Sequence, residues 1–365
     1  MGLSHDPCLT KHPAKARNYF VACYLISLVQ GDTIQGGRIK LRTIRNYLTD
    51  VEGLFAATKT NLMIVDEINY VKIVLDAIKQ FEKVPNRRYM IEDTMVIWLY
   101  NEAQKELCID SGLSAIVDWI ILGRYTGFRK SEWAQSTLSS FQKIDTWEGN
   151  PPLAMILSDF QFLGSNQERL SVKTLYNQGL QLEEVAKQVE HVNIEWRHQK
   201  NGDHGQKVMY SRDRNNPKYC PTLAALRIAW RALRLGVPSD EPIGVFKKKK
   251  RRRFITDTMV AEILREAAKE VLKITDPDEL KLWSTHSIRV TAANLLHRER
   301  FSDSFIQSRL RWKSNSFLVY LRNTIYAAGQ HCMIKISNTN LPPMAERTYR
   351  DAEPHEGCIL AAPQA

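Results

Sequence analysis

Apolar residues in the first part of the chain recur with the spacing of a helix. They fall mostly three and four positions apart, which places them on one helix face. The members of this stripe are Ile39, Leu41, Ile44, Leu48, Val51 and Leu54. Lys40, Arg42 and Arg45 lie between them and form a basic face, which is either a surface for a polyanion or an ordinary solvated surface. The pattern predicts a helical unit over residues 1–86, ended by a polar, basic segment around Pro85.

The chain beyond this segment mixes helical and strand patterns. Helical periodicity begins after Asp93 and continues through a strongly apolar stretch that we expect to end near Gly123. Short runs with β-branched residues at 153–162 and 192–196 indicate strands. The segment 207–211 can pair with the second of these runs across a glycine-containing turn, so we expect a hairpin there.

Three further helical patterns follow the expected hairpin. They begin at Pro221 and cover residues 259–272 and 286–296. At 365 residues the chain is long enough for two cores, and the patterns predict a mainly α protein with a small antiparallel β-sheet. The expected parts are a helical first domain, an α+β domain and a C-terminal tail, over residues 1–86, 87–330 and 331–365.

Basic side chains outnumber acidic ones in this chain. The 51 lysines and arginines against 40 acidic residues give a net charge of +11, which favours a polyanionic partner. No apolar run approaches the length of about 18 residues that a membrane span needs, so nucleic acid is the better expectation. The six cysteines are scattered without a C-x-x-C pair. We therefore expect neither a disulfide framework nor a metal site.

Seven consecutive cations form the one low-complexity segment. They are Lys247, Lys248, Lys249, Lys250, Arg251, Arg252 and Arg253. Because like charges repel one another, we expect an exposed loop here and no packed structure. Such a run fits a phosphate clamp, a nuclear localisation signal, or both. It predicts a nuclear protein if the source is eukaryotic, and a cytoplasmic one otherwise.

Two arginines are candidates for binding a phosphodiester during reaction. Charge builds up on the non-bridging oxygens of a reacting phosphate, and the planar, permanently charged guanidinium groups of Arg129 and Arg289 suit that charge. His286 lies one helical turn before Arg289, so both can reach one phosphate. Glu132 has the same spacing from Arg129 and can orient it.

A tyrosine could act as the nucleophile in this chemistry. Its pKa near 10 makes the hydroxyl a weak nucleophile, so Tyr320 needs a base such as His286 and nearby cations. The departing 5′ oxygen of DNA needs a proton donor, for which Lys200 is the first candidate and Lys207 the alternative. The indole N–H of Trp312 can donate to a phosphate oxygen.

The joint order of these residues resembles the tyrosine recombinase, or phage integrase-like, superfamily. Residues 126–132 (T-G-F-R-K-S-E) look like its first-arginine box, T-G-x-R-x-x-E, and residues 286–289 (H-S-I-R) look like its H-x-x-R box. The segment around Trp312 is more similar to recombinases of eukaryotic Crypton and DIRS-like mobile elements than to bacterial members, which usually carry L-G-H-x-S there. The interval from Trp312 to Tyr320 is one residue shorter than in typical bacterial members, and Tyr326 is the alternative nucleophile.

The resemblance implies a helical core-binding (SAM-like) domain and an α+β recombinase catalytic domain. It implies a site-specific DNA recombinase for integration or excision of a mobile element, in which Tyr320 forms a 3′-phosphotyrosyl link without cofactor or divalent metal. The implied partners are double-stranded DNA and three further copies of the chain, as a homotetramer on two DNA sites. A catalytically inactive DNA-binding descendant of such an enzyme and a type IB topoisomerase are the alternatives.

Overall fold

The protein forms two compact units, over residues 1–86 and 87–365. The division lies between Asn86 and Arg87. Our computed structural model describes residues 9–31, 39–59, 69–81, 87–137, 141, 152–199, 202–313, 317, 318 and 321. The expected tail, residues 331–365, lies outside this range.

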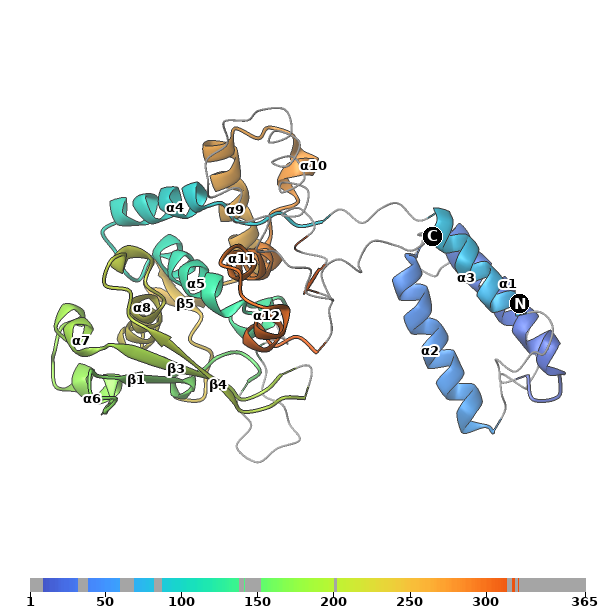
Figure 1. The fold of residues 1–365 in the computed structure, drawn as a ribbon, viewed down its shortest axis with the longest axis horizontal. Coiled ribbons are helices and arrows are strands. Elements are labelled where there is room, and N and C mark those ends of the chain that lie inside the picture. Colours follow the sequence, from blue (N-terminus) through green and yellow to red (C-terminus); the bar gives the residue numbers. More distant parts are fainter. Residues whose placement is uncertain are drawn as a thin grey trace. The chain divides into compact units, whose positions relative to one another are not determined.

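The first unit contains three helices. These are α1 (Ala14–Gln30), α2 (Leu41–Ala57) and α3 (Tyr70–Phe81) (Figure 1). Each helix contributes apolar side chains to one small core, which includes Val21, Leu25 and Leu28 from α1, Ile44, Leu48 and Phe55 from α2, and Val71 from α3. The expectation of a helical first unit is confirmed for the described residues.

The apolar stripe of α2 differs from the expected one at its end. Leu54 is 51% exposed, and Phe55 is buried in its place. The reason is the helical period of 3.6 residues, because a residue seven positions after Leu48 returns to the same face and one six positions after it does not. Arg42 and Arg45 are exposed, as the predicted basic face requires.

The second unit combines helices with a small antiparallel sheet, which confirms the expected fold class. Its longer helices are α4 (Asp93–Lys105), α5 (Gly112–Thr126), α8 (Pro221–Arg234), α9 (Asp257–Leu272) and α11 (Thr285–Arg298). The shorter ones are α6 (Val172–Asn177), α7 (Leu182–Gln188), α10 (Pro277–Leu280) and α12 (Asp303–Arg309). No described helix is long and apolar enough to cross a membrane.

Helix α5 is the centre of the second unit. It packs against α4, α8 and α11 (Figure 1), and is apolar nearly all round, as a helix enclosed by others must be. The expected end near Gly123 is wrong, because the helix continues to Thr126. Gly123 serves packing instead: a Cβ there would lie 2.5 Å from Cγ2 of Ile288 on α11.

An ion-pair network joins α5 to α8. Asp118 of α5 is buried and accepts hydrogen bonds from Arg227 Nε (2.6 Å) and Arg231 Nη2 (2.5 Å) of α8. Arg231 also donates to the carbonyl of Ile109 at 2.6 Å. A buried charge is tolerated when it is paired and hydrogen-bonded in this way. The network therefore fixes the two helices that form the centre of the unit.

The sheet has the strand order β2-β1-β3-β4 and is antiparallel throughout. The strands are β1 (Phe160–Leu163), β2 (Arg169–Leu170), β3 (His191–Trp196) and β4 (Gln206–Ser211). Val192, Ile194 and Trp196 are buried on one face, which contacts α8. The expected hairpin of β3 and β4 is confirmed. The expected strand at 153–162 is confirmed only at its end, because a 3-10 turn (Leu157–Asp159) precedes β1.

The run of seven cations is a hairpin and not the loop that we expected. Strands β5 (Val245–Lys248) and β6 (Arg251–Phe254) pair with Lys247 opposite Arg252 and Lys248 opposite Arg251. Two contacts offset the repulsion between these like charges. Val245 and Phe246 are buried at the base of the hairpin, and Arg252 bonds to Glu241 (2.6 Å) and to the carbonyl of Gly236 (2.9 Å).

Candidate functional site

The first turn of α11 presents His286 and Arg289. Ser284 caps the helix, since its hydroxyl accepts from the backbone N–H of His286 at 3.3 Å. Arg289 follows one turn later and is only 4% exposed, whereas His286 is exposed. The helix therefore carries a surface imidazole directly beside a buried guanidinium, in the i, i+3 arrangement that the sequence predicts.

The C-terminal ends of α5 and α12 meet beside this turn. Helix α5 is capped at its C-terminal end by Gly127, which has a φ of 57°. Arg311 follows the last turn of α12 in the same left-handed region (φ 60°), and the N–H of Trp312 donates to the Gln307 carbonyl at 2.8 Å. The two ends are in contact, because a Cβ on Gly127 would lie 2.8 Å from Cδ2 of Leu310. Several main-chain carbonyls, which the end of a helix leaves available for partners outside it, therefore converge here.

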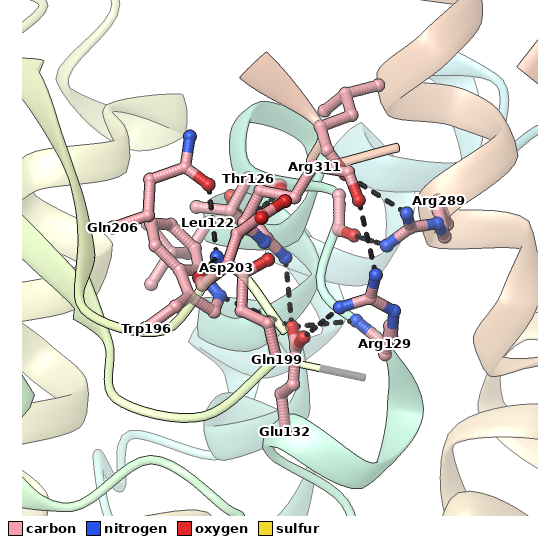
Figure 2. Close-up of polar contacts among 12 residues, drawn as sticks. Leu122, Thr126, Arg129, Glu132, Trp196, Gln199, Asp203, Gln206, Arg289 and Arg311 are labelled. Atoms are coloured by element: carbon pink, nitrogen blue, oxygen red, sulfur yellow. Dashed lines mark hydrogen bonds and ion pairs between the residues drawn. The ribbon is translucent and has the colours of Figure 1, made fainter. Parts of the chain in front are cut away.

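Three arginines donate to these carbonyls (Figure 2). Arg289 bonds through Nη1 to Gly127 (2.9 Å) and through Nη2 to Leu310 (3.0 Å). Arg311 Nη1 donates to the Thr126 carbonyl at 3.0 Å, and Arg129 Nη2 donates to the carbonyl of Arg311 at 3.2 Å. Cations are favoured at helix C-termini by the backbone dipoles. The helix ends therefore account for the gathering of positive charge.

Glu132 balances part of this charge. The 3-10 turn Lys130–Glu132 places its carboxylate beside Arg129, whose Nη1 lies 3.1 Å from Oε1. Its other oxygen, Oε2, accepts from Arg311 Nη2 at 3.0 Å, from the N–H of Arg129 at 2.9 Å and from Trp196 Nε1 at 3.3 Å (Figure 2). The side chain is 7% exposed. Glu132 thus binds both the backbone and the side chain of Arg129, and it binds two further partners that the sequence did not suggest.

Trp312 covers the guanidinium of Arg289. The guanidinium carbon lies 4.4 Å from the centre of the indole ring, a cation–π contact. The other neighbour of the indole is Phe317, stacked with a centroid distance of 5.5 Å and an interplanar angle of 11°. Phe317 and Leu321 are both fully buried in a cluster with Ala292 of α11. Phe317, three positions before Tyr320 in the sequence, therefore packs beside the indole that covers Arg289.

His286 is held in its neutral form. Desolvation by neighbouring atoms, and then the positive charges of Arg289 and Arg88, lower the pKa of His286 to about 4. The residue nevertheless keeps more than a third of its surface exposed. At neutral pH its imidazole is therefore uncharged and has a lone pair that can accept a proton. A phosphate beside it would favour the charged form and raise this pKa.

The two principal arginines differ in exposure. The side chain of Arg129 is 22% exposed, whereas Arg289 is enclosed by carbonyls and by Trp312. A ligand approaching from solvent would therefore meet the guanidinium of Arg129 first. Arg289 contributes its charge from behind, through surroundings of low dielectric constant.

Two of the predicted catalytic residues, Lys200 and Tyr320, lie outside the described residues, as does the alternative nucleophile Tyr326. The alternative proton donor, Lys207, is on β4 and pairs with Glu195 across the hairpin at 3.1 Å. Side chains alternate along a strand, so Lys207 leaves the face opposite to Trp196. Because Trp196 contacts Glu132, Lys207 lies on the far face of the sheet from the arginines.

The hairpin of β3 and β4 is attached to the segment before Trp312. Gln206 donates to the carbonyl of Ser308 at 3.3 Å, and Arg309 donates to the carbonyl of Met209 at 3.2 Å. Lys313 forms an ion pair with Asp203 of the hairpin turn at 3.3 Å. The hairpin of β3 and β4, with Asp203 at its turn, therefore belongs to the same local assembly as Arg311 and Trp312.

The remaining predicted residues belong to other elements of the structure. The cations of residues 247–253 occupy the hairpin of β5 and β6, and Lys40, Arg42 and Arg45 belong to the first unit. Arg311 and Trp196 were missed by the sequence analysis. One signal could have indicated Arg311: it ends a helical pattern, at a position where glycine is preferred.

No protein-family model matches this chain, and no curated protein matches it. Among solved structures, the chain is similar to residues 82–397 of the Tn1549 transposon integrase in complex with circular intermediate DNA. That similarity has a TM-score of 0.40 and 12% sequence identity, and it covers 87% of this chain and 81% of the other. Function is therefore inferred from the site itself.

Proposed function

We propose that this protein is a DNA strand-transfer enzyme of the tyrosine recombinase type. The observation that carries the proposal is the convergence of Arg129, Arg289 and Trp312, which come from distant parts of the chain. Fixed guanidinium groups beside a neutral imidazole are the parts that transfer of a phosphodiester to a tyrosine requires.

The proposed reaction gives each of these residues one role. Tyr320 attacks the phosphorus, its proton passes to His286, and a bond from the phenolic oxygen to phosphorus forms. The bond from phosphorus to the 5′ oxygen breaks, and Lys200 protonates that oxygen. Arg129 and Arg289 stabilise the charge on the non-bridging oxygens. A 5′ hydroxyl of a second strand reverses the steps and reseals the DNA.

The proposed reaction needs no cofactor, because the covalent link stores the energy for resealing. The phosphotyrosyl bond conserves the energy of the phosphodiester, so resealing requires no nucleoside triphosphate. The arginines supply the charge that a divalent metal would otherwise provide. We propose integration or excision of a mobile element as the biological role, by a homotetramer on two DNA sites.

Double-stranded DNA is the proposed partner. Lys248, Arg251 and Arg253 are exposed on one face of the β5–β6 hairpin, because the register places Lys248 opposite Arg251 and Phe246 opposite Arg253. Lys249 and Lys250 extend the charge at the turn. Such a row of cations suits phosphates and carries no information on base sequence. In a eukaryotic cell the same run would direct the protein to the nucleus.

A DNA-binding protein without cleavage activity is the second candidate. The observation in its favour is the burial of Arg289, whose two terminal nitrogens donate to main-chain carbonyls. An arginine in that position can serve the fold alone. A type IB topoisomerase would share the chemistry and would relax supercoiled DNA without joining two sites.

Covalent trapping tests the proposal. Wild type and Tyr320→Phe are incubated at low salt with nicked duplexes from the DNA that flanks the gene, and any adduct is mapped by peptide mass spectrometry. We expect a phosphotyrosyl adduct at Tyr320 in wild type alone. An adduct at Tyr326 would reassign the nucleophile. Salt-sensitive binding without any adduct would favour the DNA-binding protein, and relaxation of plasmid without strand exchange would favour the topoisomerase.

A further inference from the structure

Arg311 occupies a backbone position where glycine would be easier. It follows the last turn of α12 with a φ of 60°, and its N–H donates to the carbonyl of Ser308 at 3.1 Å. A Cβ is disfavoured in this left-handed conformation, so glycine is the usual residue at this point of a helix end. A side chain at such a site costs free energy that its contacts must offset.

The side chain of Arg311 is fully buried and has three kinds of partner. Nη2 forms an ion pair with Glu132 at 3.0 Å, and Nη1 donates to the carbonyl of Thr126 at 3.0 Å. The guanidinium carbon also lies 3.9 Å from the centre of the Trp196 ring. Burying a charge is expensive unless it is paired. Arg311 therefore has a strained backbone and a costly buried charge, both maintained by the same neighbours.

These contacts form a closed ring with Arg129. Arg129 donates from Nη1 to Glu132 and from Nη2 to the carbonyl of Arg311. Glu132 in turn accepts from Arg311 (Figure 2). Arg311 thus holds the half-buried guanidinium of Arg129 from two sides, through its own carbonyl and through the carboxylate of Glu132.

We propose that Arg311 is a positioning residue for strand transfer, and that it fixes the direction in which Arg129 meets the phosphate. Arg311 itself is buried and does not touch the DNA. Because Trp312 follows it directly, the same residue joins the orientation of Arg129 to that of the indole over Arg289. The inference rests on the proposed function.

The structure offers a matched control for the backbone strain. Arg300 has a φ of 60° after α11, and its N–H donates to the carbonyl of His297 at 3.0 Å. Arg300 is exposed, whereas Arg311 is buried. Arg311→Gly and Arg300→Gly therefore relieve the same strain, and only the first removes a buried guanidinium.

The experiment compares cleavage with binding. Single-turnover adduct formation on a nicked duplex is measured at saturating DNA for wild type, Arg311→Gly, Arg300→Gly, Glu132→Gln and the double variant with Arg311→Gly and Glu132→Gln. DNA affinity is measured in the Tyr320→Phe background, and folding is followed by circular dichroism. Arg311→Lys, which keeps the charge and loses the fork, is a further variant in case Arg311→Gly does not fold.

We expect Arg311→Gly to slow cleavage about 100-fold, the effect of displacing a catalytic group by about 1 Å, with affinity within about threefold of wild type. Arg300→Gly should cleave normally. The double variant should be no slower than the slower single variant, because both changes break one ring. Three results would overturn the inference about Arg311 without touching the proposed function. They are normal cleavage by Arg311→Gly, a loss of DNA binding by Arg311→Gly that equals its loss of cleavage, and additive effects of Arg311→Gly and Glu132→Gln in the double variant. A wild type that forms no adduct would overturn the proposed function as well.

Discussion

The guanidinium carbon of Arg289 lies 4.4 Å from the centre of the Trp312 ring. The indole covers the flat face of the guanidinium, while the carbonyls of Gly127 and Leu310 bind its edge. A guanidinium held on its face and its edge has little freedom to turn. The indole therefore restricts the motion of a charged group in addition to offering an N–H.

Replacement of Trp312 should separate these two roles. We expect Trp312→Ala to slow single-turnover cleavage about 5- to 30-fold, equivalent to about 1–2 kcal/mol for a desolvated cation–π contact. Trp312→Phe keeps an aromatic face without the N–H and should recover part of the rate. The control is Trp98→Phe on α4. Equal rates for wild type and Trp312→Ala would show that the stack has no part in cleavage.

The stability of the second unit should depend on pH through His286. Its pKa is about 4 when folded and near 6.5 when unfolded, so the unfolded chain binds the proton more readily. The contribution of His286 to the free energy of unfolding is therefore fully present above pH 6.5 and is lost as the pH falls toward 4. The free energy of unfolding measured with urea should therefore fall over this pH range more for wild type than for His286→Asn. Parallel pH profiles for both proteins would contradict the assignment to His286.

DNA should reverse this shift. A phosphate next to the imidazole favours its charged form, so the pKa of His286 should rise on binding. NMR titration of the imidazole Cε1 of His286, in the Tyr320→Phe background with and without duplex DNA, measures this change in pKa. His297, whose pKa is lowered by burial, is the internal reference and should titrate alike in both samples. An unchanged pKa for His286 would place the phosphate elsewhere.

The ion-pair network between α5 and α8 should be important for stability. Asp118→Ala leaves the guanidinium of Arg231 buried without its carboxylate. Breaking one partner of a buried pair costs about 3–5 kcal/mol, which chemical denaturation would detect. Glu241→Ala breaks the more exposed pair with Arg252 and should cost less than about 1 kcal/mol. Similar losses in the two variants would show that burial does not determine the strength of these pairs.

The β5–β6 hairpin should control the salt dependence of DNA binding. Replacing Lys248, Arg251 and Arg253 by glutamine should reduce the slope of log affinity against log salt by up to about 2.7, or about 0.9 for each phosphate contact. Lys187→Gln, an exposed site on α7, should leave the slope unchanged. Identical slopes in fluorescence anisotropy for wild type and the triple variant would remove the hairpin from the DNA-binding surface.

Local patterns were sufficient to predict much of the fold. The apolar stripe through Ile44 and Leu48 has the period of a helix. The alternation of buried and exposed residues in β3 has the period of a strand, so each pattern predicts its own element. The predicted end of α5 was wrong because a glycine at position 123, taken by itself, suggests the end of a helix. Its real role depends on Ile288, which is distant in the sequence. The hairpin of β5 and β6 was missed because charge repulsion suggested a loop, while the buried Val245 and Phe246 decide the structure.

The candidate site was predictable to the extent that its contacts are local. Arg129 with Glu132, and His286 with Arg289, are pairs three residues apart, so spacing alone was informative. The contacts of Arg311 with Glu132 and Thr126 join parts of the chain separated by 179 and 185 residues. No periodic pattern reports such contacts, and they become visible only when the ends of α5 and α12 meet.

The acceptors that orient the three arginines are largely main-chain atoms. Four of them are the carbonyls of Thr126, Gly127, Leu310 and Arg311. A carbonyl is present whatever side chain its residue carries, so these positions can change in evolution without loss of an acceptor, provided that the two helix ends keep their course. The arrangement of charge can therefore persist in relatives whose sequences have diverged widely around it.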